Sequence, residues 1–319
     1  MKIAFLGTPE FSKIVLEALH NSRHKVVCIV TNLDKESGRG HKVKFSPVKQ
    51  YGVDNNIPVL QYKSISKEGE EDIKKFSPDV LITASFGQIL KQNILNLAPK
   101  GVVNVHTSLL PKYRGSCPIN WVVINGEKTT GVSIMQTDIG LDTGDVMLSK
   151  TLDILPDETA GELTLRLAEL GAKTLLEALD QIEQNKQTFT KQDEGKSSYY
   201  PMLDKEMGKI DFNKTAQEIQ NLCNGLNPWP ICYVPFNKET GEKLKVYKAK
   251  PFLPQENLPI PLKLFQNGEV VFASAKTGLV VKCEDGYVLL DIIQAPNSKA
   301  MPSKSYLNGK TIQVGTMLV

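Results

Sequence analysis

The sequence predicts an α/β protein, with a doubly wound, mostly parallel sheet followed by a small OB-like β-barrel. Two observations carry this prediction. In the first half, short continuous apolar strands alternate with helical patterns, which is typical of a parallel sheet covered on both faces. In the last third, short alternating strands follow one another between glycine turns, which is typical of a small barrel.

The first half contains apolar, β-branched stretches of strand length. We expect strands at 2–6, 26–31, 80–83, 102–105 and 132–135. The spacing of apolar residues predicts helices at 11–19, near 68–76 and 118–125, and at 158–184. Ligands of such sheets bind beyond the carboxyl ends of the strands, so the segments after Thr83 and Val105 are the places to search.

A polar stretch separates the two predicted domains. Residues 185–209 are rich in Lys, Ser and Gln and lack periodicity, and we interpret them as a linker. We therefore expect a first domain at 1–184 and a second at 210–319. The second domain is expected to begin with a helix at 214–225 and to continue with strands at 231–236, 244–249, 269–273, 279–282 and 287–293.

Composition excludes several classes of protein. The chain has 319 residues, which suits two domains of about 100–200 residues each. Its 41% hydrophobic content excludes disorder for most of the chain, and no apolar run reaches the ~18–20 residues that span a bilayer. The five cysteines are scattered without a Cys-x-x-Cys, which indicates neither a disulfide framework nor a zinc site. We expect a soluble cytoplasmic protein.

The net charge of +3 is unevenly divided along the chain. Residues 205–319 hold 14 lysines, no arginine and 10 acidic residues. Lysine is a mobile point charge that suits contact with phosphate. A lysine-rich soluble surface explains the same composition, so charge alone leaves both interpretations open.

The segment 101–115 holds the first candidate for chemistry. Asn104 and His106 alternate onto the same face of a predicted strand, at its end. An amide and an imidazole in that place can bind and protonate a developing oxyanion. A hydrogen-bonded structural histidine is the alternative, and the spacing alone favours it.

The segment 137–145 holds the second candidate. It follows an apolar strand and contains Asp138, Asp142 and Asp145 with two glycines, so we expect a tight loop at the same edge of the sheet as His106. Three aspartates can form turns, bind a divalent cation or take part in catalysis, and the spacing favours turns.

Together these motifs closely resemble the signature of the 10-formyltetrahydrofolate-dependent formyltransferases. The resemblance lies in Asn104-x-His106-x-Ser108-Leu-Leu-Pro111, followed about thirty residues later by Asp142-Thr-Gly. Further motifs resemble the branch of the family that acts on tRNA: Phe5-Leu-Gly-Thr-Pro9, Gly38-Arg39-Gly40, Ser46-Pro47-Val48-Lys49, Phe86-Gly87-x-Ile-Leu90 and Asn227-Pro228-Trp229-Pro230. The matches run from residue 3 to about 230 and weaken in the predicted barrel.

The resemblance implies a Rossmann-like formyltransferase fold. It also implies transfer of the formyl group of 10-formyltetrahydrofolate to the α-amino group of methionine on initiator methionyl-tRNA. By position, Asn104, His106 and Asp142 correspond to the family's catalytic residues. Asn104 and His106 would stabilise the tetrahedral oxyanion, and Asp142 would orient His106 and favour its charged form. No metal is needed for this reaction, and we expect a monomer.

The resemblance also implies residues that bind each substrate. The folate cosubstrate would contact Phe86, Gly87, Gln88, Ile89, Ser108, Leu109, Leu110 and Pro111. Ordinary packing is the alternative for the leucines and for the 86–90 segment. The acceptor stem of the initiator tRNA would contact two basic groups, Arg39, Lys42 and Lys44 in a glycine-punctuated loop and Lys243, Lys245 and Lys248 along one strand of the barrel. A solvated loop is the alternative for the first group.

Four other functions are possible rivals to this one. A formyltransferase that acts on a nucleotide-sugar amine uses the same donor and stays open, whereas a purine-synthesis enzyme would lack the C-terminal third. A dinucleotide-dependent oxidoreductase is disfavoured because 7–12 lacks Gly-x-Gly-x-x-Gly. The intact trio argues against a non-catalytic RNA-binding protein. Two features depart from the family pattern. Ser85 stands where the family usually has a small apolar residue, and 252–275 lacks the Pro-Gly-x-Ile motif expected in the barrel, which leaves the strand register there open.

Overall fold

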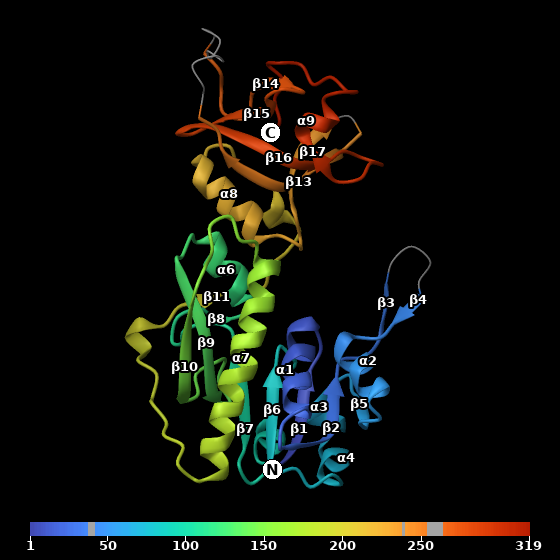
Figure 1. Ribbon diagram of the computed structural model, residues 1–319, viewed down its shortest axis with the longest axis vertical. Helices are drawn as coiled ribbons and strands as arrows, with labels where there is room; N and C mark the ends of the chain where they lie inside the picture. Colours follow the sequence, from blue (N-terminus) through green and yellow to red (C-terminus); the bar gives the residue numbers. More distant parts are fainter. Residues whose placement is uncertain (38–41, 238–239, 254–263) are drawn as a thin grey trace. The chain divides into compact units, whose positions relative to one another are not determined.

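The computed structural model describes residues 1–37, 42–237, 240–253 and 264–319, and it divides into two compact units (Figure 1). The first unit comprises 1–118, 129–153 and 164–200. The second unit comprises 119–128, 154–163 and 201–319. Two short stretches from the first half of the chain therefore group with the C-terminal residues. The boundaries expected at 1–184, 185–209 and 210–319 stay a prediction.

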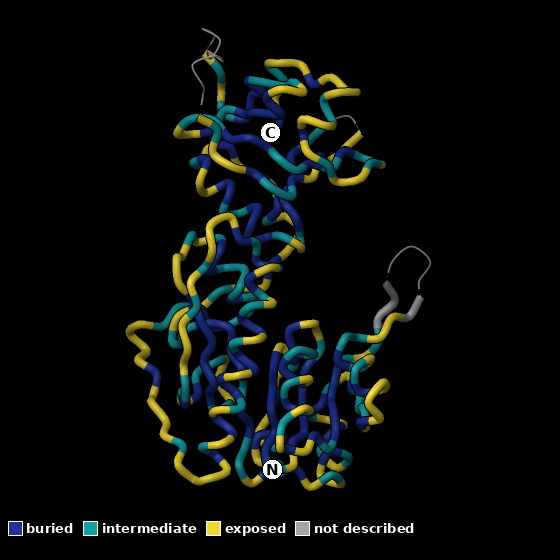
Figure 2. The backbone as a smooth tube through the Cα atoms, viewed as in Figure 1, coloured by how far each residue is buried: buried dark blue, intermediate teal, exposed yellow. Residues whose placement is uncertain are grey.

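A seven-stranded sheet forms the centre of the first unit, in the order β10-β9-β7-β6-β1-β2-β5. The five strands from β5 to β7 are mutually parallel, whereas β9 and β10 are antiparallel to their neighbours. The prediction of a mostly parallel sheet is confirmed, and Figure 2 shows its central strands as almost continuously buried. The strands are β1 (Lys2–Gly7), β2 (Lys25–Thr31), β5 (Val59–Gln61), β6 (Val80–Ala84), β7 (Val102–His106), β9 (Thr129–Gln136) and β10 (Val146–Asp153).

Helices pack on this sheet through apolar faces. In α1 (Glu10–His20), Phe11, Val15 and Leu19 recur at four-residue spacing and are buried. The side chain of Ser46 caps α2 (Pro47–Asp54) by accepting a hydrogen bond from the Lys49 N–H. The remaining helices of this half of the chain are α3 (Ile65–Glu68), α4 (Glu70–Lys74), α5 (Gln92–Leu95) and the long α7 (Ala160–Glu183), whose first turn groups with the second unit.

The direction of β9 corrects one expectation about the site. We expected the 137–145 loop at the same edge of the sheet as His106, as though β9 were parallel to β7. Because β9 is antiparallel to β7, Gln136 pairs with Val103, and the Thr137 N–H donates to the Val102 carbonyl at 2.8 Å. The loop therefore starts at the amino end of β7 and reaches His106 only by folding back.

Two pairs of short strands complete the first unit. β3 (Lys35–Ser37) and β4 (Lys42–Lys44) form an antiparallel pair. β8 (Arg114–Gly115) is parallel to β11 (Tyr199–Tyr200), which lies in the stretch that we interpreted as a linker. The second half of that polar stretch thus contributes a strand to the first unit.

An antiparallel sheet forms the second unit, in the order β12-β13-β16-β15-β14, with β17 paired to β16. All five strands expected here are present, and Leu244 and Val246 alternate into the core from β13. The strands are β12 (Cys232–Asn237), β13 (Glu242–Pro251), β14 (Val270–Ser274), β15 (Gly278–Cys283), β16 (Gly286–Gln294) and β17 (Met301–Pro302). Its helices are α6 (Pro118–Ile124), α8 (Ala216–Gly225) and α9 (Ser303–Tyr306).

Helix α8 begins with a capping box, in which Thr215 and Glu218 each accept from the other's backbone N–H. None of the helices within the described ranges combines the length and the apolar character that a membrane span requires.

The close approach of β9 and β10 gives the first prediction. A Cβ atom on Gly131 would lie 2.1 Å from the Lys150 carbonyl oxygen and 2.6 Å from Leu109 Cδ2. We expect Gly131→Ala to lower the free energy of unfolding by about 1–3 kcal/mol, as overpacking of a sheet interior does. Urea unfolding followed by tryptophan fluorescence measures this, with Gly309→Ala as the control because no heavy atom lies within 4 Å of its added Cβ. Equal midpoints for the two variants would contradict the packing argument.

Candidate active site

Asn104 and His106 lie at the carboxyl end of β7, on the same face of the strand, as the sequence predicts. Thr83, on the neighbouring β6, pairs with Asn104 in the sheet, and its hydroxyl donates to Asn104 Oδ1 at 2.8 Å. This hydrogen bond fixes the amide so that its Nδ2 end is the one left to donate. Asn104 is partly exposed, so that donor can reach a bound molecule.

His106 is buried between two acceptors. Its Nε2 lies 3.0 Å from the carbonyl oxygen of Tyr113, and its Nδ1 lies 3.6 Å from Oδ1 of Asp142. Both oxygens can only accept, but the distance at Nε2 is that of a hydrogen bond and the distance at Nδ1 is longer, so Nε2 carries the proton of the neutral ring. Nδ1 then faces the carboxylate with its lone pair, and it becomes a donor to Asp142 when the ring gains a second proton.

Asp142 is held in the left-handed region of the backbone map, with φ of 56°. Its Oδ2 accepts a hydrogen bond from the Gly115 N–H at 2.9 Å, which leaves Oδ1 directed to His106. A non-glycine residue keeps such a φ only where surrounding contacts determine it. The structure therefore brings His106 and Asp142 together from separate segments, beside Asn104.

The other two aspartates of the 137–145 loop do not join this pair. Asp138 accepts from the Gly140 N–H at 3.0 Å and from the Thr143 hydroxyl at 2.8 Å, which is turn chemistry. Asp145 is exposed. In the part of the chain that the structure describes, no three His, Cys, Asp or Glu side chains are grouped so that they could hold a metal ion.

The stretch 190–200 packs against both segments that contact the His106–Asp142 pair. Thr190 bridges Val146 just after the 137–145 loop, and Arg114 and Gly115 pair with Tyr199 and Tyr200. Composition gave no signal of this role, because the stretch is polar and aperiodic. Burial distinguishes Gln192 from its polar neighbours, and burial is not visible in one sequence.

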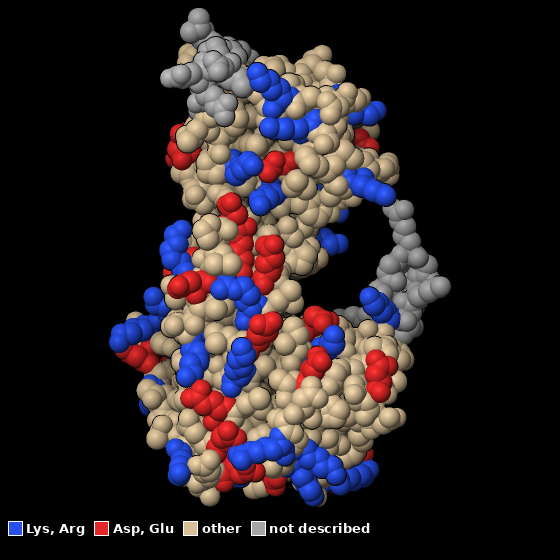
Figure 3. Space-filling model, viewed as in Figure 1, with Lys and Arg blue, Asp and Glu red and all other residues tan. Residues whose placement is uncertain are grey.

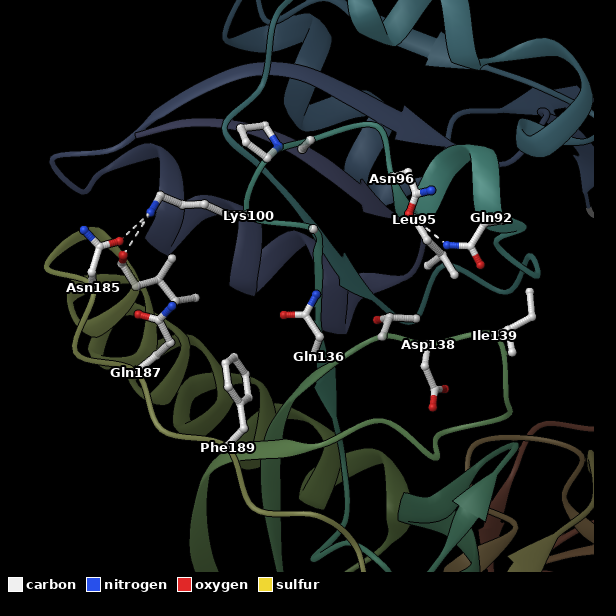
Figure 4. Close-up of a pocket in the computed structure, with 15 residues that line it drawn as sticks. Gln92, Leu95, Asn96, Lys100, Gln136, Asp138, Ile139, Asn185, Gln187 and Phe189 are labelled. Atoms are coloured by element: carbon white, nitrogen blue, oxygen red, sulfur yellow. Dashed lines mark hydrogen bonds between the residues drawn. The ribbon is translucent and has the colours of Figure 1, made fainter.

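A polar cavity of about 910 Å³ lies at the opposite end of the loop from Asp142. Figure 4 shows Gln92 of α5 and the following Asn96 on one side of it and Asp138 and Ile139 of the loop on another. Lys100 closes a further side by donating to the Ile182 carbonyl and the Asn185 side chain. Of the exposed large apolar side chains on nearby stretches of sequence, Ile139 (67% exposed) lines the cavity, whereas Leu141 (59%) and Ile89 (81%) do not.

The eight residues expected to contact folate are absent from the lining of this cavity. Phe86 packs in the hydrophobic core, and Gly87 and Ile89 are exposed. Gln88 is held by hydrogen bonds with Asn32, Tyr62 and Ile65.

The second expected folate segment is engaged in the same way with the protein itself. The buried Ser108 hydroxyl donates to the Lys112 carbonyl at 2.7 Å, and Leu109 lies over Gly131. Leu110 and Pro111 are half-buried. These contacts support the packing alternative for the side chains. Several backbone groups of both segments are also engaged, since the carbonyls of Phe86 and Ser108 accept hydrogen bonds and the Leu110 N–H donates one.

The residues expected to contact tRNA are only partly described. Arg39 lies outside the described residues, as does the side chain of Lys42, whereas Lys44 is exposed next to them. Lys243 and Lys245 are exposed on one face of β13, and Lys248 is half-buried at an irregularity of the β13–β16 pairing. On the face shown in Figure 3, basic side chains are spread over the second unit and do not gather into one patch.

Comparison with known proteins gives matches over both halves of the chain. A family model described as Formyl transferase matches residues 1–179, and one described as Formyl transferase, C-terminal domain, matches 202–311. The chain is 42% identical over 322 residues to methionyl-tRNA formyltransferase of Ruminiclostridium cellulolyticum, covering 100% of this chain and 99% of that protein. It is 41% identical over 319 residues to methionyl-tRNA formyltransferase of Clostridioides difficile, covering 100% of both.

Solved structures share the fold at lower identity. An N-formyltransferase from Helicobacter canadensis, in complex with folinic acid and dTDP-3-aminofucose, matches with a TM-score of 0.64 and 21% identity, over 92% of this chain and 99% of that one. HypX from Aquifex aeolicus, in complex with tetrahydrofolic acid, matches with a TM-score of 0.62 and 16% identity, over 99% of this chain and 50% of that one. At these identities the likeness shows the fold alone.

The surroundings of His106 give a prediction about its tautomer. We expect the neutral ring to carry its proton on Nε2, because Nε2 lies at hydrogen-bond distance, 3.0 Å, from its acceptor, whereas Nδ1 lies 3.6 Å from Asp142. Long-range ¹⁵N–¹H correlation spectra of protein labelled at histidine measure the tautomer directly, and the chain has only four histidines. The spectrum of His106→Gln assigns the signal. A neutral ring protonated on Nδ1 would contradict the geometry.

Proposed function

Since the chain belongs to the formyl transferase family, we propose that it transfers the formyl group of 10-formyltetrahydrofolate to the α-amino group of methionine on initiator methionyl-tRNA. The product is N-formylmethionyl-tRNA, which serves translation initiation. Relatives named for this activity are about 40% identical over the full chain. The observation in the structure that best supports it is the meeting of His106 and Asp142, 3.6 Å apart, beside the oriented amide of Asn104.

Formyl transfer to an amine places negative charge on the formyl oxygen. An α-amino group has a pKa of roughly 7.7–8.0, so an appreciable fraction is already neutral at pH 7 and can attack. The larger barrier is the tetrahedral oxyanion, which fixed donors stabilise best. Asn104 Nδ2 is such a donor, because the hydrogen bond from Thr83 holds the amide before any substrate binds.

Proton transfer is the task of the other two side chains. As the new C–N bond forms, the amine nitrogen must lose a proton, and as the old bond breaks, N10 of the folate must gain one. Asp142 Oδ1 and His106 Nδ1 face each other and together can accept the first proton and supply the second. A protonated His106 would also place a positive charge near the developing negative charge, two residues along the strand from Asn104.

The exposed apolar side chains of the 86–90 and 137–142 segments suit a folate cosubstrate. Ile89, Ile139 and Leu141 leave large apolar areas exposed, and an aromatic ring system would cover such side chains. The backbone of 86–90 and of 137–142 carries amide groups that could bind the polar edge of the ring. We therefore place the donor between these two loops, with its formyl group directed to Asn104.

We place the protein in the cytoplasm, where its tRNA substrate is used, and expect it to be a monomer. Light scattering coupled to gel filtration should give the mass of one chain, 35.3 kDa.

Substrate choice tests the proposed function directly. The enzyme is offered 10-formyltetrahydrofolate with charged initiator tRNA, charged elongator methionyl-tRNA or an amino-sugar nucleotide. We expect rapid formylation of the first, much slower reaction with the second and none with the third. Preferential formylation of the amino-sugar nucleotide would overturn the proposal in favour of its rival.

Removal of the oriented amide gives the third prediction. Asn104→Ala should lower kcat by about 10²–10³-fold, the usual loss for one oxyanion donor. The KM for tRNA should change little, because Asn104 acts on the reacting group. Steady-state kinetics with charged initiator tRNA measure this, with Asn55→Ala as the control at an exposed position. A kcat within threefold of the wild type would exclude Asn104 from the oxyanion site.

The exposed lysines of β13 give the fourth prediction. Lys243→Ala with Lys245→Ala should weaken tRNA binding and flatten its salt dependence, by about 0.7–0.9 in the log–log slope for each phosphate that is no longer neutralised. Filter binding between low and moderate salt measures the slope. Lys250→Ala is the matched control, because Lys250 pairs with Asp291 at 3.0 Å on the same sheet, more closely than Lys243 pairs with Glu206 at 3.8 Å. An unchanged log–log slope in the double variant would show that these lysines do not contact tRNA phosphates.

A further inference from the structure

A fully buried arginine lies behind the His106–Asp142 pair. Arg114 has no exposed surface, and its guanidinium forms two hydrogen bonds with the Glu194 carboxylate, at 2.9 and 2.7 Å. Its Nη1 also donates to the Tyr199 hydroxyl, and its Nε donates to Gln192 Oε1 at 3.0 Å. The hydrogen bonds from Arg114 lower the pKa of the Glu194 carboxyl, so the ion pair persists at neutral pH.

Gln192 connects this arginine to the 137–145 loop. Arginine can only donate, so its Nε fixes which end of the Gln192 amide is the oxygen. The nitrogen end then points the other way and donates to two backbone carbonyls, those of Asp142 at 2.8 Å and Gly144 at 2.7 Å. Gln192 is buried, with an exposed fraction of 7%. Both of its amide hydrogens and its oxygen are therefore engaged.

The backbone that Gln192 holds is the strained part of the loop. Asp142 has a φ of 56°, and a side chain in that region of the map costs of order 1–3 kcal/mol unless its surroundings impose it. The Gly115 N–H holds the carboxylate of the same residue. Asp142 is thus fixed at its carbonyl by Gln192 and at its side chain by Gly115, and Arg114 takes part in both arrangements.

We propose that Gln192 is a positioning residue for the reaction, which holds Asp142 so that its carboxylate meets His106. The proposal rests on the proposed function for its kinetic part only. It assigns a role in formyl transfer to the polar stretch 190–200, which touches no reacting atom. A displacement of about 1 Å in a catalytic group can cost on the order of 10²-fold in rate, so the loss of this support should appear in kcat.

The substitution Gln192→Glu tests the nitrogen end of the amide separately from the oxygen end. It keeps the length of the side chain and an acceptor for Arg114, but it places a carboxylate oxygen where the NH₂ group meets two carbonyl oxygens. Gln192→Met is the uncharged counterpart, which removes both donors, and with them the acceptor for Arg114 Nε, at similar volume. Gln184→Glu is the matched control for the first, because Gln184 is exposed in the same unit.

Kinetics with charged initiator tRNA give the fifth prediction. We expect Gln192→Glu and Gln192→Met to lower kcat about 100-fold, with both KM values within threefold of the wild type, and Gln184→Glu to be unchanged. Single-turnover rates then test the route of the effect. In an Asp142→Asn background, Gln192→Met should cost less than threefold, because the group that it positions is already lost. The same 100-fold loss in both backgrounds would overturn the proposal.

The ¹⁵N resonances of the His106 ring depend on its contact with Asp142, so they show whether the contact is intact without any substrate. Its ¹⁵N resonances should shift in Gln192→Met and stay in place in Gln184→Glu, and thermal melting of each variant shows that it is folded. If Gln192→Glu does not fold, the kinetics and the ring resonances of Gln192→Met alone test the proposal. A folded Gln192→Met with unchanged ring resonances, or with a normal kcat, overturns the positioning role. Failure of the wild type on every tRNA would instead overturn the proposed function, while the ring resonances would still test the contact.

Discussion

One short segment holds both members of the His106–Asp142 pair. The Tyr113 carbonyl accepts from the imidazole, and two residues later the Gly115 N–H donates to the carboxylate. The relative position of the two groups is therefore set by one rigid stretch of backbone and not by two independent loops. That stretch is itself held by strand pairing with Tyr199 and Tyr200, so the chemistry at β7 depends on a distant part of the sequence.

The direction of β9 explains why this support is needed. A loop between parallel strands would deliver its carboxylate to the correct edge of the sheet by topology alone. Because β9 runs back along β7, the 137–145 loop starts at the wrong edge and must fold back to reach His106. A loop that folds back makes few contacts of its own, and its position has to be set by side chains from elsewhere, such as Gln192.

The features that depend on nearby residues could be predicted from the sequence. Strand and helix positions follow from apolar spacing, and the period of two places Asn104 and His106 on one face of their strand. The direction of a strand cannot be predicted from its own residues. The edge of the sheet at which the 137–145 loop starts was therefore predicted wrongly. The hydrogen bond between Arg114 and Gln192 joins residues 78 positions apart, which local patterns cannot show. The polar composition around Gln192 is also that of a linker. The roles of the site residues themselves stay predictions.

Asn104 and Asp142 are held in place in different ways, and the reaction explains the difference. Asn104 and its orienting Thr83 are on adjacent parallel strands, where sheet hydrogen bonds fix both backbones. The oxyanion develops at one point and gains most from donors that do not move. Asp142 instead belongs to a loop at positive φ, where hydrogen bonds from Gln192 and Gly115 take the place of strand pairing. The carboxylate has to meet a ring that a different strand carries, so it comes from a separate segment, and side-chain hydrogen bonds fix it where sheet pairing cannot.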